Sequence, residues 1–513
     1  MRSETLLAAH ALRRPDHPAV VCGAERVSYA ELNEAVRKTA AGLQRLGVRP
    51  GDRVLLYLPN SIEFVQLAYA AFTVGAAVVP VNTRLSANEV EHIACDSSPA
   101  VAIFQAGGRD ALRAGLRQAD DCLAVVLGGA TGAEIAYEQL VCGPPEPLSE
   151  MPLDAEDCII LYTSGTTGRP KGAVLTHANM IFQNVYMHAL EWGIGAEDRF
   201  LVVTPLAHRG GIARLYNALG LGGTLVVMEK FEPDAAMELI EHERVTVAGL
   251  VPTILRMMLP QISSSPARFS SLRRIVVSTE AFPVPLKREI ARLLPDAMLL
   301  SVFGMTEASV TNLSHAEHFS HPESVGRPFP GIEVRIVDDA GRNLHQGEVG
   351  EIWVRSGIPG RCGVMKGYFN RPLETAAALT DGWFHSGDLG RLDADGYLYV
   401  VDRKKDMVLS GGYNIYSKEV EHALDSHPDV AESAVIGVAD EIFGEAVAAF
   451  VVARPGTHPT VQQLIEYCRT ALAGYKKPKY VFFVDSLPKT SVGKVLKTEL
   501  RKLAAKRADT MQD

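Results

Sequence analysis

The sequence has few cysteines, and no arrangement of them that would build a site. Its 513 residues contain seven cysteines, no two of which form a Cys-x-x-Cys pair, and no His-Glu-x-x-His motif occurs. An odd number of scattered cysteines indicates neither a disulfide framework nor a structural zinc site.

The sequence also lacks a long apolar run and an excess of positive charge. The longest mildly apolar stretch, Leu67 to Val81, is interrupted by Pro80, and no stretch approaches the ~20 residues that cross a bilayer. The net charge of −9 argues against general binding to nucleic acid or anionic membranes. Glu4 and His10 stand where a signal peptide needs an unbroken apolar core. We therefore expect a cytoplasmic protein that spans no membrane and binds no nucleic acid.

The length predicts at least two domains, because 513 residues exceed one ordinary hydrophobic core. Apolar residues make up 47% and charged residues 22%, which is typical of a globular protein. Strands alternate with helices over the first 150 residues, which predicts parallel α/β layers. The expected elements are a helix begun by Ser28 and Glu31, a strand at 54–58, a helix after Asn60, a strand at 77–81 and a helix begun by Ser86 and Glu89.

The most informative stretch is Leu161 to Gly172. The apolar run at 158–162 predicts a strand, and the sudden rise in glycine, serine and threonine after it predicts a tight loop, closed by Lys171. Glycines let the backbone approach a ligand, and successive N–H groups can form a nest for anions. This composition suits a polyphosphate, although the spacing is not the Walker pattern. A polar surface turn and a flexible linker are the alternative interpretations.

The segment from Thr163 to Gly172 resembles the phosphate-loop signature of the adenylate-forming superfamily, which includes acyl-CoA synthetases, luciferases and peptide-synthetase adenylation domains. Further motifs of this superfamily follow in its order, so that the resemblance covers about residues 20–500. It implies a large layered α/β domain with parallel sheets at 1–402, a hinge at 403–405 and a small mobile α+β domain at 406–513.

The resemblance implies a set of nucleotide-binding residues. The phosphate loop would use Thr163, Ser164, Gly165, Thr166, Thr167, Gly168 and Lys171. In the segment 301–308, Phe303 would stack on adenine beside Gly304, Thr306 would reach the α-phosphate, and Glu307 would bind Mg²⁺ together with Thr166. Such a donor set suits Mg²⁺, which binds one or two carboxylates plus phosphate oxygens.

Two further segments resemble the ribose site and the hinge. In 383–390, Asp388 would accept both ribose hydroxyls, since an ionised carboxylate is an acceptor only. In 400–406, Arg403 would lie near the ribose and Lys405 would be the pivot. Taken alone, these residues would be a turn aspartate and a solvated charge run.

The last hundred residues or so predict an α+β unit. By the same resemblance, Gly411 and Gly412 would line the pantetheine tunnel of coenzyme A, and Lys494, beside Gly493, would be the catalytic lysine of adenylation. The expected elements are a helix at 417–424, strands at 434–438 and 446–452 and a helix at 461–472.

The residues assigned to the acyl pocket differ in part from those usual in the superfamily. His208 would be a pocket-wall or gate residue, although a lone histidine is more often a satisfied core residue. Thr279 and Glu280 stand where relatives have small residues, and a carboxylate in an apolar pocket is costly unless it is paired. Glu280 could face a polar or cationic acid, pair with Arg209 or Arg273, or point to solvent. The remaining assigned acyl-pocket residues are Arg209 and Gly326.

The resemblance of these segments to the superfamily implies an ATP-dependent acid–thiol ligase. A carboxylate and ATP would give acyl-AMP and pyrophosphate, and coenzyme A would then give acyl-CoA and AMP. The acid is expected to be short, branched or polar. The implied ligands are ATP, Mg²⁺ and coenzyme A. A homodimer is possible. The alternatives are transfer to a carrier-protein thiol, a luciferase-like oxygenase and a non-catalytic nucleotide-binding scaffold.

Overall fold

The computed structural model of the protein describes residues 2–116, 122–144, 156–163, 170–278, 282–411, 413–489 and 495–510, with side chains described as far as residue 505. The predicted site residues outside these ranges are Ser164, Gly165, Thr166, Thr167, Gly168, Thr279, Glu280, Gly412 and Lys494.

The chain forms two compact units. Unit 1 consists of Met1–Val334 and Val354–His385, and unit 2 of Arg335–Trp353 and Ser386–Asp513. The chain passes between the units within three strands, which are β17 (Glu333–Val337), β18 (Gly350–Arg355) and β21 (Trp383–Leu392). The predicted hinge at 403–405 lies inside unit 2, and its role stays a prediction.

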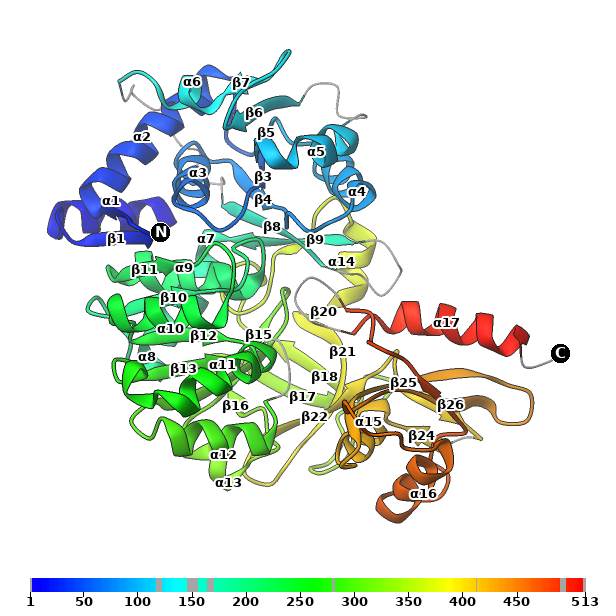
Figure 1. Ribbon diagram of the computed structural model, residues 1–513. Coiled ribbons are helices and arrows are strands. Elements are labelled where there is room, and N and C mark those ends of the chain that lie inside the picture. Colours follow the sequence, from blue (N-terminus) through cyan, green and yellow to red (C-terminus); the bar gives the residue numbers. More distant parts are fainter. Residues whose placement is uncertain are drawn as a thin grey trace. The chain divides into compact units, whose positions relative to one another are not determined.

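Unit 1 contains a nine-stranded sheet in the order β16-β15-β14-β13-β12-β10-β11-β1-β2 (Figure 1). The strands from β14 to β1 in this order are parallel to their neighbours, and β15, β16 and β2 are antiparallel. Parallel strands end at the same edge of a sheet, which is where ligands bind in α/β proteins. The segments containing His208 and Phe303 both belong to this edge, since they follow β10 and end β14. The strands are β1 (Pro18–Cys22), β2 (Glu25–Ser28), β10 (Arg199–Val202), β11 (Thr224–Val227), β12 (Val247–Leu250), β13 (Arg274–Val277), β14 (Met298–Gly304), β15 (Ser309–Leu313) and β16 (Arg327–Pro328).

A second sheet of unit 1 has eight strands in the order β19-β9-β8-β4-β3-β5-β6-β7. Its strands from β8 to β7 are parallel, whereas β9 is antiparallel to β8 and β19 is antiparallel to β9. The strand predicted at 158–162 is confirmed as β8, and the next element is β9. The strands are β3 (Arg53–Tyr57), β4 (Ala77–Pro80), β5 (Val101–Gln105), β6 (Leu123–Leu127), β7 (Ile135–Ala136), β8 (Asp157–Thr163), β9 (Lys171–Thr176) and β19 (Gly367–Tyr368), with β20 (Leu379–Thr380) paired to the start of β21.

Helices cover the faces of both sheets. Figure 1 shows α3 on one side of β3, β4 and β5, and α4 and α5 on the other. The helices predicted to begin after Ser28 and Ser86 are confirmed, each with a capping box, and a third capping box at Thr176 begins α7. The helices of unit 1 are α1 (Ser3–Arg13), α2 (Tyr29–Arg45), α3 (Ile62–Thr73), α4 (Ala87–Ser97), α5 (Arg109–Gly115), α6 (Tyr137–Val141), α7 (His177–Ile181), the π-helix η2 (Phe182–Met187), α8 (His188–Trp192), α9 (Arg209–Leu221), α10 (Pro233–His242), α11 (Pro252–Ser264), α12 (Val284–Leu293), α13 (Glu317–Ser320) and α14 (Pro372–Ala378), with 3₁₀ turns at Ala106–Gly108 and Pro266–Phe269.

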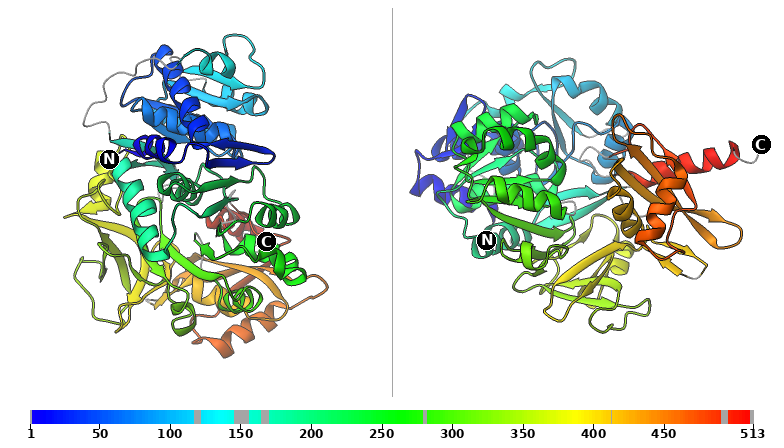
Figure 2. Two further views of the ribbon diagram at one scale, coloured as in Figure 1. Left: turned by 90° about the vertical axis from the view of Figure 1, so that its left-hand side faces the viewer. Right: turned by 60° about the horizontal axis from the view of Figure 1, so that its bottom comes forward.

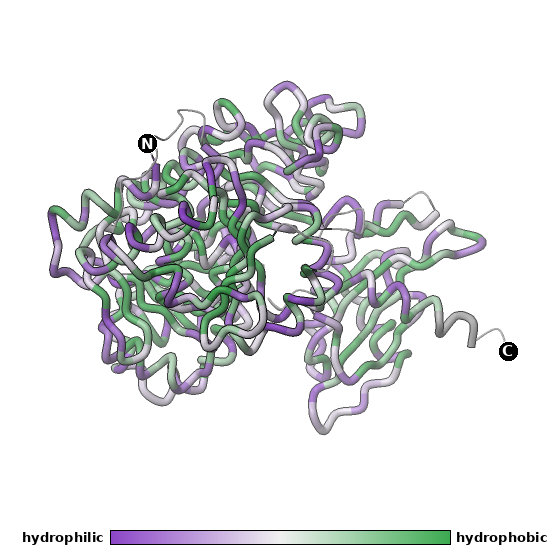
Figure 3. Tube along the Cα trace, turned by 90° about the horizontal axis from the view of Figure 1, so that it is seen from above, coloured by the Kyte–Doolittle hydropathy of each residue, from purple (hydrophilic) through white to green (hydrophobic). Residues whose placement is uncertain are grey.

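The strands are held by apolar packing against these helices. Leu201, Ala248 and Ile275 of β10, β12 and β13 form one buried cluster with Leu286 and Ile290 of α12. Figure 3 shows hydrophobic residues along the interior strands and hydrophilic residues in the outer turns. This packing fixes the strand ends from which the site segments leave.

Unit 2 contains the sheet β24-β23-β26-β25, with β27 paired to β26. The helices α15 and α16 share one buried cluster with this sheet, and Leu500 of α17 belongs to a second cluster. Figure 2 shows these elements in orange to red. The helices predicted at 417–424 and 461–472 and the strands predicted at 434–438 and 446–452 are confirmed as α15, α16, β25 and β26. The elements are β22 (Leu398–Arg403), β23 (Val408–Ser410), β24 (Tyr413–Ile415), α15 (Ser417–Asp425), β25 (Val430–Asp440), β26 (Gly444–Ala453), α16 (Val461–Ala471), β27 (Tyr480–Phe483) and α17 (Lys497–Thr510).

Candidate active site

The two ends of the predicted phosphate loop are brought together by a hairpin. Thr163 at the end of β8 pairs with Lys171 at the start of β9. Gly172 permits this close pairing, because an added Cβ would lie 2.6 Å from Ile160 Cγ2 and 3.1 Å from the Tyr162 ring. The hairpin therefore fixes where the loop leaves and re-enters the sheet, while residues 164–169 lie outside the described part of the chain.

Tyr368 contacts both Lys171, at the end of the predicted phosphate loop, and Glu307, the predicted ligand of Mg²⁺. The edge strand β19 pairs with β9, with Tyr368 opposite Ala173. The Tyr368 hydroxyl donates a hydrogen bond to Glu307 Oε1 at 3.0 Å, and Lys171 Nζ lies 5.4 Å from the centre of the Tyr368 ring. Burial and the charge of Glu307 raise the pKa of Tyr368, so that its hydroxyl stays protonated at neutral pH. No sequence pattern singled out Tyr368, because its role comes from the pairing of β19 with β9.

Thr306 and Glu307 lie in a tight turn between β14 and β15. The turn is closed by the Met305 N–H, which donates to the Ala308 carbonyl at 2.8 Å, and the backbone carbonyl of Glu307 accepts from Met365 N–H at 2.8 Å. Gly304 permits the turn, since an added Cβ would lie 2.8 Å from the Ala308 carbonyl oxygen. Thr306 and Glu307 are half-buried. The turn therefore presents a hydroxyl and a carboxylate side by side at the end of β14.

This donor set fits a magnesium ion. Glu307 Oε1 is already bonded to Tyr368, which orients the carboxylate and leaves Oε2 as a ligand atom. One carboxylate beside a lysine suits an ion whose other ligands come from phosphates and water. In the described part of the chain, no three His, Cys, Asp or Glu side chains gather into a dedicated metal cage.

His208, assigned to the acyl pocket, is fixed at the start of helix α9. It is the N-terminal cap residue of α9, and the Asn82 amide nitrogen lies 2.8 Å from His208 Nε2. Since an amide nitrogen only donates, Nε2 accepts and the neutral ring carries its proton on Nδ1. Asn82 follows β4 of the eight-stranded sheet, so the histidine joins segments from both sheets of unit 1. The loop before it is fixed by Asn60, whose side chain bonds to Thr204, Leu206 and Met228.

The two arginines considered as partners of Glu280 have other described partners. Arg273 forms an ion pair with the buried Asp198. Arg209 donates to Gln183 Oε1 and, at 3.4 Å, to Asn184 Oδ1, both in η2. Burial lowers the pKa of Arg209 to about 10. Glu280 lies outside the described residues, so its own orientation stays a prediction.

Gly326, also assigned to the acyl pocket, lies against β15. Its φ is +101°, and an added Cβ would lie 2.1 Å from the Asn312 carbonyl oxygen. A side chain cannot be accommodated there, so the residue serves at least to bring this loop against the sheet.

The predicted ribose residues face each other in unit 2. Asp388 of β21 pairs with Arg403 of β22, and Arg403 Nε lies 3.5 Å from Asp388 Oδ1. The Asp388 backbone N–H is bonded to Ser386 Oγ at 3.0 Å. The aspartate is half-buried and the arginine exposed, an arrangement in which a bound diol could reach the carboxylate.

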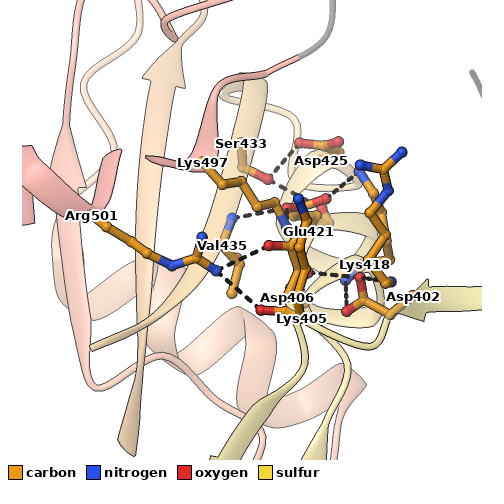
Figure 4. A network of polar contacts seen from close by, with 12 residues as sticks. Asp402, Lys405, Asp406, Lys418, Glu421, Asp425, Ser433, Val435, Lys497 and Arg501 are labelled. Atoms are coloured by element: carbon orange, nitrogen blue, oxygen red, sulfur yellow. Dashed lines mark hydrogen bonds and ion pairs between the residues drawn. The ribbon is translucent and has the colours of Figure 1, made fainter. Parts of the chain in front are cut away.

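The helix that follows Lys494 is bonded to the predicted hinge (Figure 4). Arg501 of α17 forms an ion pair with Asp406 at 3.0 Å and donates to the Lys405 carbonyl at 3.4 Å. Lys497, at the start of α17, lies 2.8 Å from the buried Glu421. Lys494 itself lies outside the described residues, but the helix beginning three residues later is fixed to the segment 405–406.

The same network continues to the end of β22. Glu421 also pairs with Lys418 at 2.6 Å and accepts from Val435 N–H at 2.9 Å. Lys497 donates to Ser417 Oγ at 2.6 Å, and Ser417 Oγ donates to the buried Asp402 at 3.1 Å. A continuous polar chain therefore joins β22, α15 and α17.

Gly411, one of the two predicted tunnel glycines, occupies the turn between β23 and β24. Its φ is +57°, and an added Cβ would lie 3.1 Å from the Phe443 ring. Both facts favour glycine at this turn. Gly412 lies outside the described residues.

Among the helices that the structure describes, none combines the length and the apolar character required to span a bilayer.

Comparison with known proteins gives consistent matches over nearly the whole chain. Residues 7–369 match the AMP-binding enzyme family, and residues 419–494 match the AMP-binding enzyme C-terminal domain. The chain is 38% identical over 492 residues to a feruloyl-CoA synthase from an Amycolatopsis species, covering 95% of this chain and 96% of that protein. It is 37% identical over 495 residues to the long-chain-fatty-acid–CoA ligase FadD13 of Mycobacterium tuberculosis, covering 93% of each. The crystal structure of ATP-bound MatB from Rhodopseudomonas palustris is similar with a TM-score of 0.88 and 30% identity, covering 98% of this chain and 99% of that one.

Proposed function

Since the chain belongs to the AMP-binding enzyme family, we propose that its site residues divide between them the two half-reactions of an AMP-forming acyl-CoA ligase. The ligase activity follows from the CoA-ligase relatives that match over most of the chain. The residue roles given below are the proposal.

One observation carries these roles. Lys171 and Glu307 both contact Tyr368, so that a cation for phosphate and a carboxylate for a metal lie around one aromatic ring. ATP needs this combination, because the charge of its β- and γ-phosphates must be neutralised while pyrophosphate, the leaving group, is held in line with the attack on the α-phosphorus.

In the first half-reaction, an oxygen of the substrate carboxylate attacks the α-phosphorus of ATP. The new oxygen–phosphorus bond forms as the bond from this phosphorus to the bridging oxygen breaks, and pyrophosphate leaves with that electron pair. The loop from Thr163 to Lys171 holds the β- and γ-phosphates, Phe303 stacks on adenine and Thr306 donates to the α-phosphate. Lys494 neutralises the charge that develops between the two reactants.

Glu307 and Thr166 would hold Mg²⁺, which when bound neutralises charge on the phosphate oxygens. Asp388 accepts the ribose hydroxyls, with Arg403 beside it. These groups bind and orient, and no covalent protein intermediate is required.

In the second half-reaction, the thiol of coenzyme A attacks the carbonyl carbon of the acyl-adenylate. The carbon–sulfur bond forms, the carbon–oxygen bond to AMP breaks, and the thiol proton passes to solvent. Movement about Lys405 would withdraw Lys494 and bring Gly411 and Gly412 to the adenylate. The bonds from Arg501 to Asp406 and the Lys405 carbonyl support this role, because they connect the helix after Lys494 to the pivot.

The substrate in this proposal is a short, branched or polar carboxylic acid. The test is release of AMP and pyrophosphate across a panel of short, branched, aromatic, long-chain and quaternary-ammonium acids, each with and without coenzyme A. Turnover that requires both one acid class and coenzyme A supports the proposal. Adenylate formation without a thioester would instead indicate a carrier-protein acceptor, and no response to any acid would refute the assigned site.

A cytoplasmic location and a homodimer belong to the same proposal. Cell fractionation tests the first, and sedimentation at assay concentrations tests the second.

A further inference from the structure

Helix α9 carries a buried arginine, Arg214, and a half-buried one, Arg209, and neither has an acidic partner among the described residues. Arg214 is only 5% exposed. Its guanidinium lies 5.2 Å from the centre of the Trp192 ring, and its Nη1 has no hydrogen-bond acceptor in the described structure. Arg209, five residues earlier, donates to the neutral amides of Gln183 and Asn184. Helix α9 therefore carries one buried and one half-buried positive charge, and the described residues supply no compensating carboxylate.

Such an arrangement is costly for the folded protein. A buried charge that is neither paired nor hydrogen-bonded costs several kcal/mol. Burial and the neighbouring charge of Arg209 lower the pKa of Arg214 to about 9, so the guanidinium remains protonated at neutral pH. His188, which stacks on Trp192, has its pKa lowered by burial and by Arg214, and it stays neutral. No described neighbour thus supplies negative charge.

The surroundings accommodate the side chain of Arg214. An added Cβ on Gly249 of β12 would lie 2.7 Å from Arg214 Cδ, so this glycine makes room for the arginine side chain. One turn before Arg214, Gly210 faces the hydroxyls of Thr204 and Ser278, which would lie 3.8 Å and 4.0 Å from an added Cβ. Thr204 and Ser278 follow β10 and β13, at the sheet edge where the site segments begin.

The position of Arg214 suits the far end of a substrate. His208, at the start of α9, is the proposed gate of the acyl pocket, and Arg214 lies about 9 Å further along the helix axis at 1.5 Å per residue. A substrate whose reacting carboxylate lay beyond the strand ends would extend toward Arg214.

We propose that the acyl substrate is a dicarboxylic acid whose second carboxylate is bound by Arg214, with Arg209 adding positive potential. This inference rests on the proposed function, since it assigns a substrate class to the same pocket. The distal carboxylate would accept hydrogen bonds from the Arg214 guanidinium and supply the missing counter-charge.

The test compares matched acids on the full chain with ATP, Mg²⁺ and coenzyme A. The pairs are butanoate and succinate, hexanoate and adipate, and octanoate and suberate, with AMP release as the readout. We expect kcat/KM for at least one dicarboxylate to exceed that of its monocarboxylate partner by about 10²-fold, the scale of a desolvated ion pair. The Arg214→Met variant should reverse this preference, mainly through KM, and Arg214→Lys should retain part of it. Arg199→Met is the matched control, because Arg199 is paired with Glu243 and its loss should leave the preference unchanged.

Thermal unfolding distinguishes this role from a structural one. Without substrate, Arg214→Met should unfold at the same or a higher Tm than the wild type, because it removes an unpaired buried charge. The proposal is overturned if the wild type shows no preference for dicarboxylates, or if Arg214→Met lowers the Tm without changing the preference. The proposal is also overturned if Arg214→Met lowers the Tm and adding Glu280→Gln to this variant restores it, because Glu280 would then be the counter-charge of Arg214. Turnover of monocarboxylates alone refutes only this inference, whereas no turnover of any acid refutes the proposed function.

Discussion

Replacing Tyr368 with phenylalanine should slow adenylation and leave thioester formation intact. The substitution removes the hydroxyl that donates to Glu307 at 3.0 Å, and it keeps the ring beside Lys171. A hydrogen bond to a charged group contributes about 1.5–3 kcal/mol, so kcat/KM for ATP should fall by roughly 10- to 100-fold. The loss should come with a higher Mg²⁺ requirement, because Tyr368 orients the carboxylate assigned to the metal.

A second variant separates the hydroxyl from the ring. Tyr368→Leu removes both contacts, and the lost cation–π interaction with Lys171 should cost about 0.5–2 kcal/mol more. The assay is ATP–pyrophosphate exchange at several Mg²⁺ concentrations. Thioester formation from supplied acyl-adenylate is measured in parallel, since that half-reaction uses neither the metal nor the loop.

The control for this pair is Tyr57→Phe. Tyr57 is buried in unit 1, and its hydroxyl donates to the neutral Thr83 carbonyl at 3.0 Å. Its loss should reduce stability by about 1 kcal/mol and leave the Mg²⁺ requirement unchanged. The reasoning fails if Tyr368→Phe exchanges pyrophosphate like the wild type, or if both half-reactions slow equally.

Three further results are expected. Lys494→Ala should lose about 10²–10³ in adenylation rate, the scale of one lost transition-state donor, and spare thioester formation; equal loss in both steps would contradict the two-conformation mechanism. Lys497→Met should lower the free energy of unfolding by about 3 kcal/mol in urea titrations, because Glu421 stays buried with one cation fewer, whereas the exposed Lys502→Met on the same helix should change it by less than about 0.5 kcal/mol. Burial lowers the pKa of His177 to about 3, so the stability due to its neutral ring is complete above the ordinary pKa of about 6.5 and is lost as pH falls from there toward 3. The free energy of unfolding should therefore be about 2 kcal/mol lower at pH 5 than at pH 7. A His177→Gln variant with the same pH dependence as the wild type would refute this assignment.

Local patterns in the sequence predicted most of the fold. The capping boxes at Ser28 and Ser86 and the apolar run at 158–162 are confirmed as the starts of α2 and α4 and as β8. These features depend on residues a few positions apart, and so they can be read without knowing the tertiary structure. The family was also readable from the sequence, because its motifs are short segments whose spacing follows from loops at strand ends.

Contacts between distant segments could not be predicted in this way. The bond from Asn82 to His208 joins the two sheets of unit 1, and Arg273, considered as a partner of Glu280, forms an ion pair with Asp198. Hydrophobic periodicity indicates that a face is buried, but it does not say which other face covers it.

By itself, therefore, the sequence determined the strands and helices, the family and the segments that carry the chemistry, because each is encoded by neighbouring residues. Only the tertiary structure decided that Tyr368 bridges Lys171 and Glu307, since this depends on β19 pairing with β9. It also decided that Arg214 is buried without a described acidic partner, because burial and charge compensation are set by what packs around α9 and not by the residues next to it in the chain.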